Sequence, residues 1–251
     1  MTDALRVQDL RKTFHPRGAA PVEALRGLTF SVPQGHIFGL LGPNGAGKTT
    51  TLRILTTLIR ASGGTAEVAG VDVDRDPLGV RKRIVVVVQE SAAEIFLTVR
   101  DNLLTFGRFH GLHGPDLKRR ADEVMEQFGL TQDASRKAQD LSGGFRRRIQ
   151  VAKALMVKTP VVFLDEFSTG MDPILKRSVM ELLREQARQG RTIVLTTQIL
   201  QEAESLCDDI LIINRGREVA RGDVPTIKAL SATHNASLED VFVELMTGDT
   251  A

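Results

Sequence analysis

A glycine-rich segment with one lysine and two threonines is the first part of the chain whose residue types and spacing could do chemistry. It runs from Gly42 to Thr50 and contains glycine, four residues of any type, glycine, lysine and threonine. Glycines let backbone amides close around phosphate oxygens, Lys48 can reach the β and γ phosphates of a nucleotide, and the Thr49 hydroxyl can bind Mg²⁺. The predicted phosphate-binding residues are Gly42, Pro43, Asn44, Gly45, Ala46, Gly47, Lys48, Thr49 and Thr50.

Two acidic residues follow the apolar run Val161–Leu164. The side chain of Asp165 would emerge at the carboxyl edge of the sheet, where α/β proteins bind ligands, and would contact Mg²⁺ directly or through water. Glu166 could orient or deprotonate an attacking water. Because phosphoryl transfer depends chiefly on positioning and charge stabilisation, loss of Glu166 should slow hydrolysis far more than it weakens nucleotide binding. The alternative is an exposed carboxylate pair at a strand end.

A second glycine-rich segment, here called the signature segment, comprises Leu141, Ser142, Gly143 and Gly144. It precedes the helical run Phe145–Leu155, so its hydroxyl and amides would form a positive helix N-terminus suited to a γ-phosphate. The alternative is a plain helix N-cap with flexible glycines. Three arginines, Arg146 to Arg148, follow without interleaved stacking aromatics, which indicates a solvated helix face and no nucleic-acid partner.

The elements that must position these residues follow an α/β pattern. Short apolar runs separated mostly by helical patterns predict a buried, mostly parallel sheet with strands at Ile37–Leu41, Ile84–Val88, Val161–Leu164, Ile193–Thr196 and Ile210–Ile213. Shorter, alternating segments predict a small antiparallel β subdomain from Leu5-Arg6-Val7, Ala24–Val32 and Thr65–Val71.

Helical periodicity dominates the middle of the chain. Strand signals disappear from about Thr98 to Lys158, where Leu117–Phe128 and Arg146–Val157 repeat apolar residues at helical spacing. A further helix is expected from Thr50 to Ile59. We therefore expect one domain over 1–251, with a core at about 1–90 and 159–222, an inserted helical lobe at about 91–158, and a tail at about 223–251. The tail contains an amphipathic helix that ends at Met246, with Ser237 as its N-cap.

The bulk composition excludes several classes of protein. The 251 residues are 42% hydrophobic and 25% charged, as in soluble globular proteins. A net charge of +2 from 33 basic and 31 acidic residues gives no field strong enough to predict nucleic-acid or anionic-lipid binding. The single cysteine, Cys207, cannot form an internal disulfide and is expected to be a buried, inert thiol. No secretory signal or apolar run of about 18–20 residues is visible, so we expect a cytoplasmic chain without direct membrane insertion.

The order of these motifs resembles the ATP-binding subunit of ABC transporters over nearly the whole chain. The resemblance implies a P-loop NTPase core of the RecA-like kind, with ATP and Mg²⁺ as cofactors. It also implies a head-to-tail homodimer or heterodimer, in which each ATP is held by one chain's phosphate loop and the other chain's signature segment.

Gln89 matches a metal-site glutamine linked to the helical lobe, and Glu90–Thr98 matches a groove that receives a short helix of a transmembrane partner. Asp172, in the loop from Ser168, matches the loop through which subunits communicate, and Phe14 matches an aromatic that stacks on adenine. A simple core Phe is the alternative for Phe14.

One position departs from the pattern of that family. Thr196 and Thr197 are followed by Gln198, where the family usually has histidine. A glutamine amide can donate to a γ-phosphate oxygen but cannot carry charge or shuttle a proton. Either Glu166 and water suffice for hydrolysis, or the site binds ATP well and hydrolyses it slowly.

The resemblance implies an ATPase subunit that powers transport through a separate permease at the cytoplasmic face of the membrane. Export is favoured because Ala236–Phe242 and Thr197–Glu204 look similar to segments of drug- and lipid-exporter ATPases. The alternatives are an ATP-gated regulatory subunit with low turnover and a soluble ABC-type switch outside transport.

Overall fold

The computed structural model describes residues 2–87, 94–168, 170–231, 233 and 236–248. Its contacts divide the chain into two compact units. The first unit comprises Met1–Ile84, Pro160–Phe163 and Arg184–Ala251, and the second comprises Val85–Thr159 and Leu164–Leu183.

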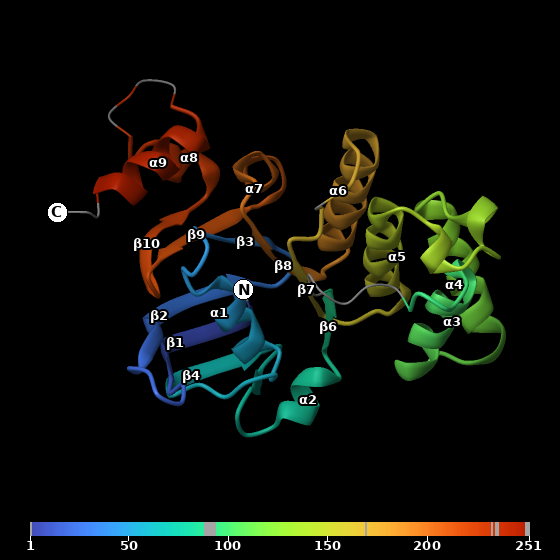
Figure 1. Cartoon of the computed structure of the whole chain (residues 1–251), viewed down its shortest axis with the longest axis horizontal. Helices are drawn as coiled ribbons and strands as arrows, with labels where there is room; N and C mark the ends of the chain where they lie inside the picture. Colours follow the sequence, from blue (N-terminus) through green and yellow to red (C-terminus); the bar gives the residue numbers. More distant parts are fainter. Residues whose placement is uncertain (1, 88–93, 169, 232, 234–235, 249–251) are drawn as a thin grey trace. The chain divides into compact units, whose positions relative to one another are not determined.

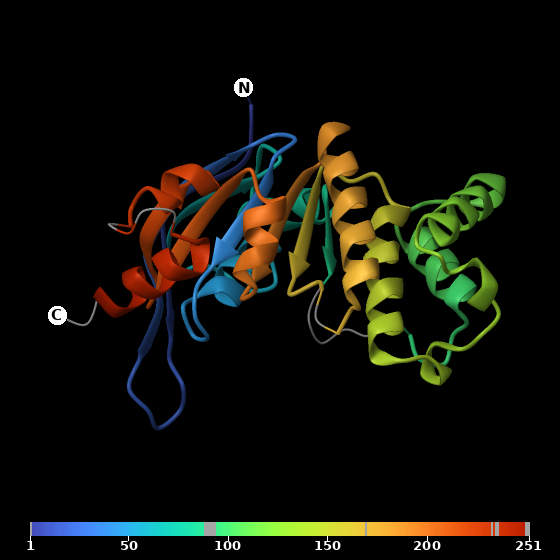
Figure 2. The ribbon, with the colours of Figure 1, turned by 90° about the horizontal axis from the view of Figure 1, so that it is seen from above.

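A four-stranded antiparallel sheet forms one side of the first unit. Its order is β2-β1-β4-β5, and its strands are β1 (Asp3–Phe14), β2 (Val22–Pro33), β4 (Gly63–Val68) and β5 (Val71–Asp72). Leu5, Val7 and Leu10 of β1 are buried. The alternation of buried and exposed residues is interrupted between Val7 and Leu10, because a bulge at Asp9 shifts the register with β2. Figure 2 shows β1 and β2 running side by side into a long hairpin. This is the antiparallel β subdomain expected from the alternating segments.

The second sheet has the order β10-β9-β3-β8-β7-β6. Its strands are β3 (Ile37–Leu41), β6 (Ile84–Val87), β7 (Val161–Asp165), β8 (Thr192–Thr197), β9 (Asp209–Asn214) and β10 (Arg217–Gly222). β3 pairs in parallel with β8 and β9, whereas β10 is antiparallel to β9. Every residue of β3 and β8 is buried, as expected of strands covered on both faces. β6 and β7 each begin in the first unit and end in the second.

The helices of the first unit are short. They are α1 (Lys48–Leu55), α2 (Pro77–Arg81), α7 (Leu200–Leu206), α8 (Val224–Lys228) and α9 (Leu238–Gly248). The expectation that α1 would reach Ile59 is wrong, because Thr57 adopts a left-handed backbone with φ 61° that ends the helix. In α9 the predicted N-cap is confirmed, since Ser237 Oγ accepts a hydrogen bond from Asp240 N at 3.1 Å.

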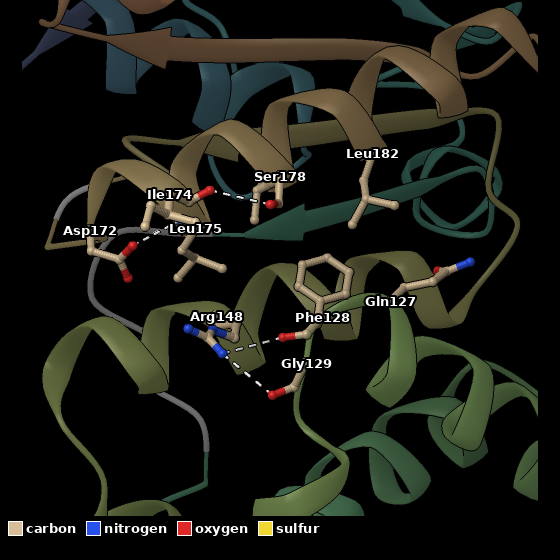
Figure 3. Close-up of a pocket in the computed structure, with 10 residues that line it drawn as sticks. Gln127, Phe128, Gly129, Arg148, Asp172, Ile174, Leu175, Ser178 and Leu182 are labelled. Atoms are coloured by element: carbon tan, nitrogen blue, oxygen red, sulfur yellow. Dashed lines mark hydrogen bonds between the residues drawn. The ribbon is translucent and has the colours of Figure 1, made fainter.

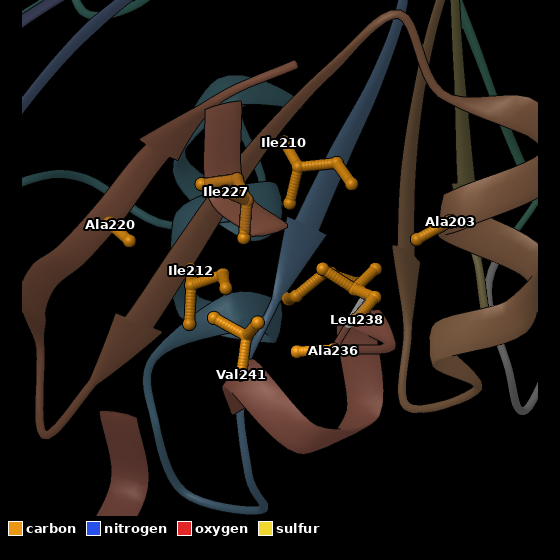
Figure 4. Close-up of a cluster of buried hydrophobic side chains, with 9 residues drawn as sticks. Ala203, Ile210, Ile212, Ala220, Ile227, Ala236, Leu238 and Val241 are labelled. Atoms are coloured by element: carbon orange, nitrogen blue, oxygen red, sulfur yellow. The ribbon is translucent and has the colours of Figure 1, made fainter. Parts of the chain in front are cut away.

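A hydrophobic cluster attaches α7, α8 and α9 to the sheet (Figure 4). Ile210 and Ile212 project from β9 toward Leu238 and Val241 of α9, and all four side chains are fully buried. Ile227 of α8 joins the same cluster. The tail of the chain is therefore part of the folded first unit.

The second unit is mainly helical. It contains α3 (Val99–Phe109), α4 (Gly114–Gln127), α5 (Gly143–Met156), two short 3₁₀ helices (Thr131–Asp133 and Ala138–Asp140) and the start of α6 (Pro173–Arg188). α3, α4 and α5 lie side by side (Figure 1). α3 and α4 approach closely at Gly107, where a Cβ would lie 2.5 Å from the Leu117 side chain. None of the described helices combines the length and apolar character needed to cross a membrane.

Candidate functional site

The phosphate loop, residues 42–50, has a backbone that only glycine can supply at two positions. Gly42 has φ 154° and a Cβ there would lie 2.2 Å from Ile213 O, while Gly47 has φ 113° and its Cβ would lie 2.8 Å from Ala24 O. The loop is thus held against the end of β9 and against β2. At Gly45, with φ 79°, a Cβ would meet no described atom within 4 Å, so the outer side of this residue is open to a ligand.

The lysine of this loop is folded onto the loop itself. Lys48 Nζ donates to Gly42 O at 2.6 Å and to Pro43 O at 3.0 Å. Its side chain is buried, although Thr49 beside it is exposed. The ammonium group therefore lies inside the loop, where an anion bound by the loop amides would meet it.

Gln198 reaches the phosphate loop across 154 positions of sequence. Its Nε2 donates to Asn44 Oδ1 at 3.0 Å. The contact arises because β3 and β8 are parallel neighbours, so the loops that follow them leave the same edge of the sheet. Thr197 fixes the start of the loop that follows β8, since its Oγ1 accepts a hydrogen bond from Ile199 N at 2.9 Å and donates one to Glu202.

Phe14 lies at the end of β1, opposite Val22 of β2. Phe14 is 39% exposed, so the alternative of a core phenylalanine is wrong. Lys12 Nζ lies 5.1 Å from the ring centroid. An exposed ring beside a cation presents a face on which another aromatic group can stack.

In the second unit, the signature segment caps α5. The helix begins at Gly143, two residues earlier than predicted, because Ser142 Oγ accepts from Phe145 N at 3.2 Å and acts as the N-cap. Arg146 Nη1 donates to Leu141 O at 2.8 Å. A Cβ on Gly144 would lie 2.3 Å from Gly170 O, whereas a Cβ on Gly143 would meet no described atom within 4 Å.

The acidic pair lies at the carboxyl end of β7. Asp165 is the last residue of the strand and is buried, and Glu166 follows it with a left-handed backbone, φ 47°. For a residue with a Cβ, that conformation costs about 1–2 kcal/mol. Contacts in the surrounding structure must therefore hold Glu166 in place.

Arg147 provides such contacts. It donates from Nε to Phe167 O at 3.0 Å, and from Nη2 to Asp165 O at 2.5 Å and Glu166 O at 2.6 Å. Burial lowers the pKa of Arg147, while the charges of Asp165 and Glu166 act in the opposite direction. The expectation that the arginine run forms a solvated helix face is wrong for Arg147, which is 7% exposed.

Asp172 directly precedes α6 and lines a pocket of about 300 Å³ in the second unit (Figure 3). Its Oδ1 accepts from Leu175 N at 2.9 Å, which caps the helix. Across the pocket, the Arg148 guanidinium faces the Phe128 and Gly129 carbonyls at the end of α4. Asp172 itself is exposed.

Gln89 and the first four residues of the predicted partner groove, 90–93, lie outside the described residues. Residues 94–98 of the groove are described, and among them Ile95 and Phe96 are 40% and 74% exposed.

Each unit thus brings together part of the predicted site. The first unit holds the phosphate loop with Gln198, and the second holds the signature segment with the acidic pair and Asp172. Reasoning from sequence missed Arg147 and its buried partner Gln150, because backbone carbonyls leave no motif to recognise.

Known proteins resemble this chain in both sequence and fold. Residues 25–169 match the family described as ABC transporter. The doxorubicin resistance ATP-binding protein DrrA of Mycobacterium tuberculosis is 41% identical over 246 residues, which cover 98% of this chain and 71% of that protein. Nod factor export ATP-binding protein I of Ralstonia nicotianae is 40% identical over 221 residues, covering 88% of this chain and 67% of that protein. A solved structure described as an ATP binding subunit of an ABC transporter has a TM-score of 0.86 at 28% identity and covers 97% of this chain and 99% of its own. The expected P-loop NTPase fold is confirmed.

Proposed function

Because the chain belongs to the ABC transporter family, as an ATP-binding subunit, we propose that it hydrolyses ATP as a dimer and drives export through a separate membrane permease. The observation that carries this proposal is the phosphate loop, whose glycines close the backbone around a buried lysine. That arrangement suits the α, β and γ phosphates of a nucleotide.

The residues of the first unit would bind the nucleotide. Lys48 would leave the carbonyls of Gly42 and Pro43 for the β and γ phosphates, and the exposed ring of Phe14 would stack on adenine. The Gln198 amide, which donates to Asn44 in the structure, would donate to a γ-phosphate oxygen of the bound nucleotide.

Mg²⁺ fits the chemistry of the predicted donors. Thr49, Asp165 and Gln89 carry oxygen atoms, which are the ligands that Mg²⁺ prefers, and the Thr49 side chain is exposed at the first turn of α1. When bound, the ion would neutralise charge that develops on the phosphates. Glu166 would orient the attacking water and accept its proton.

The signature segment would hold the ATP of a partner chain. Ser142 and Gly143 are exposed at the N-terminus of a 14-residue helix, and no described atom fills the space above Gly143. The partial positive charge and amides at such a terminus suit a γ-phosphate. Two phosphate loops and two signature segments would enclose two ATP molecules, so ATP would hold the dimer together. Asp172 would lie in the loop through which each subunit senses the ATP site of the other.

Export of a drug, a lipid or a similar molecule is proposed, and relatives named for doxorubicin resistance and Nod factor export support it. The permease would dock where Ile95 and Phe96 are exposed, and the chain would lie at the cytoplasmic face of the membrane.

Two measurements test the cycle. With ATP and Mg²⁺, Glu166→Gln should slow hydrolysis by at least about 100-fold while an ATP-bound dimer accumulates in analytical ultracentrifugation. Wild type incubated with ATP should return to monomer as ATP is consumed. Dimers that form equally without nucleotide, or a Glu166→Gln chain that stays monomeric, would refute the cycle. In membrane vesicles that also contain the permease, ATP-driven movement of doxorubicin would test the export step.

Gln198 motivates a second candidate, an ATP-gated regulatory subunit with little turnover. Comparing steady-state hydrolysis by wild type and Gln198→His separates the two candidates. A nearly inactive wild type that histidine activates would favour regulation, whereas comparable rates would favour the transport ATPase.

A further inference from the structure

We infer that Arg147 is a positioning residue that ties the signature helix α5 to the backbone carrying Glu166, and so couples the two ATP sites of the dimer. The inference rests on the proposed function, because it assigns a partner's ATP to the signature segment and the chain's own ATP to Glu166. Its physical basis lies within the second unit.

The contacts of Arg147 are unusual in number and in target. The buried guanidinium donates four hydrogen bonds. Three go to the consecutive backbone carbonyls of residues 165, 166 and 167, and the fourth goes to the side chain of Gln150. Gln150 Oε1 accepts from Nη1 at 2.7 Å and is itself buried, which fixes the guanidinium on α5. Buried carbonyls that bond a charged donor form stronger hydrogen bonds than neutral pairs do.

These contacts fall where the backbone needs support. Glu166 has the left-handed conformation, and the carbonyls before, at and after it are all held by Arg147. A few residues further on, Gly170 O lies so close to Gly144 that no side chain fits between them. The segment after β7 is therefore fixed to the first two turns of α5 at both ends.

A shift of α5 would consequently move the Glu166 backbone with it. α5 carries Ser142 and Gly143 at its start, which in the proposed dimer contact the γ-phosphate of the partner's ATP. Binding of ATP at that site would position α5, and through Arg147 it would position Glu166 for hydrolysis at the chain's own site. Each ATP site would then activate the other.

Lysine cannot replace arginine in this role. A guanidinium presents five N–H groups in a rigid plane, whereas an ammonium presents three on one nitrogen and cannot span the same set of acceptors. Charge alone would not position the carbonyls, so Arg147→Lys should behave more like Arg147→Gln than like wild type.

The test is steady-state hydrolysis by the purified full chain as a function of ATP concentration. Wild type should show cooperative kinetics with a Hill coefficient above 1. Arg147→Gln and Arg147→Lys should lower kcat on the order of 10-fold with KM changed less than about 2-fold, and should bring the Hill coefficient close to 1. Gln150→Ala removes one acceptor and should give a smaller change in the same direction. Arg119→Gln is the matched control, because Arg119 is an exposed arginine on α4 whose partners among the described residues are Asp116 and Glu123.

The outcomes separate this inference from the proposed function. If wild type hydrolyses ATP cooperatively and both Arg147 variants keep its kcat and Hill coefficient, the coupling role is wrong and the ATPase proposal stands. If wild type does not hydrolyse ATP, the proposed function itself fails. Loss of fold in Arg147→Gln would be detected by circular dichroism, and the milder Gln150→Ala would then decide, with an unchanged Hill coefficient overturning the inference.

Discussion

Two neighbouring glycines of the signature segment give a prediction that separates structure from function. Gly143 and Gly144 both lie in the first turn of α5, and neither has a positive φ. A Cβ on Gly143 would meet no described atom within 4 Å, whereas a Cβ on Gly144 would lie 2.3 Å from Gly170 O. Alanine at the two positions is therefore the same chemical change in two different surroundings.

The expected magnitudes follow from these distances. Alanine in place of glycine stabilises a helix interior by about 1 kcal/mol and less near its end, so Gly143→Ala should change the free energy of unfolding by 0 to about +1 kcal/mol. At Gly144 the new methyl would be roughly 1 Å too close to a backbone carbonyl, and overpacking of this kind costs about 1–3 kcal/mol. We expect Gly144→Ala to lower the melting temperature by roughly 2–10 °C.

At Gly143 we expect alanine to preserve the stability of the fold but to remove ATP-dependent dimerisation. In the Glu166→Gln background, Gly143→Ala should abolish the ATP-dependent dimer in analytical ultracentrifugation, because the methyl occupies the open space above the helix terminus. Thermal denaturation of the same samples checks that the fold is intact. The combination of normal stability and lost dimerisation would identify Gly143 as a ligand-facing residue.

Two results would contradict this reasoning. A Gly144→Ala chain as stable as wild type would mean that the close approach to Gly170 does not constrain the fold. A Gly143→Ala chain that still dimerises with ATP would mean that the signature segment does not face the nucleotide.

Three further predictions concern the first unit. Asn44→Ala and Gln198→Ala should show a coupling of about 0.5–1.5 kcal/mol in a double-mutant cycle of ATP affinity by calorimetry, and strict additivity would refute a role for their hydrogen bond in the nucleotide-bound chain. Leu238→Ala, in the cluster under α9, should lower the free energy of unfolding in urea by about 2–5 kcal/mol, whereas Val243→Ala on the exposed face of the same helix should change it by less than about 0.5 kcal/mol; equal effects would contradict the assigned packing. Burial, aided by neighbouring carboxylates, raises the pKa of the Cys207 thiol, so at about pH 8 iodoacetamide should label the native chain at least 10-fold more slowly than the urea-unfolded chain, as followed by mass spectrometry. Equal labelling rates would mean that the thiol is accessible.

The sheet could be predicted because its strands are buried on both faces. Such strands appear as unbroken apolar runs, and β3 has the predicted bounds, Ile37–Leu41. The end of α1 could not be predicted, since it depends on one threonine, Thr57, with a left-handed backbone. α8 has capping signals at Asp223 and Pro225, but its five residues are too few for a periodic pattern.

Within the site, local geometry follows from the sequence where the partners lie within a few residues. The hydrogen bond from Lys48 to Gly42 and the cap of α5 by Ser142 are examples, and the binding of phosphate by these residues stays a prediction. The contact between Gln198 and Asn44 depends instead on which strands are neighbours, and that order is a property of the folded sheet. Arg147 was assigned to solvent because nothing in its sequence neighbourhood distinguishes it from Arg146 or Arg148.

The way in which Arg147 recognises its partners has an evolutionary consequence. It bonds the main chain of residues 165–167, and a main-chain oxygen is present whatever side chain stands there. Phe167 could drift to another apolar residue of similar size, and the hydrogen bond to its carbonyl would survive. Pairs of positions that vary together reveal contacts between side chains. Such a search among relatives would therefore overlook the link between Arg147 and residues 165–167, even if every relative possessed it.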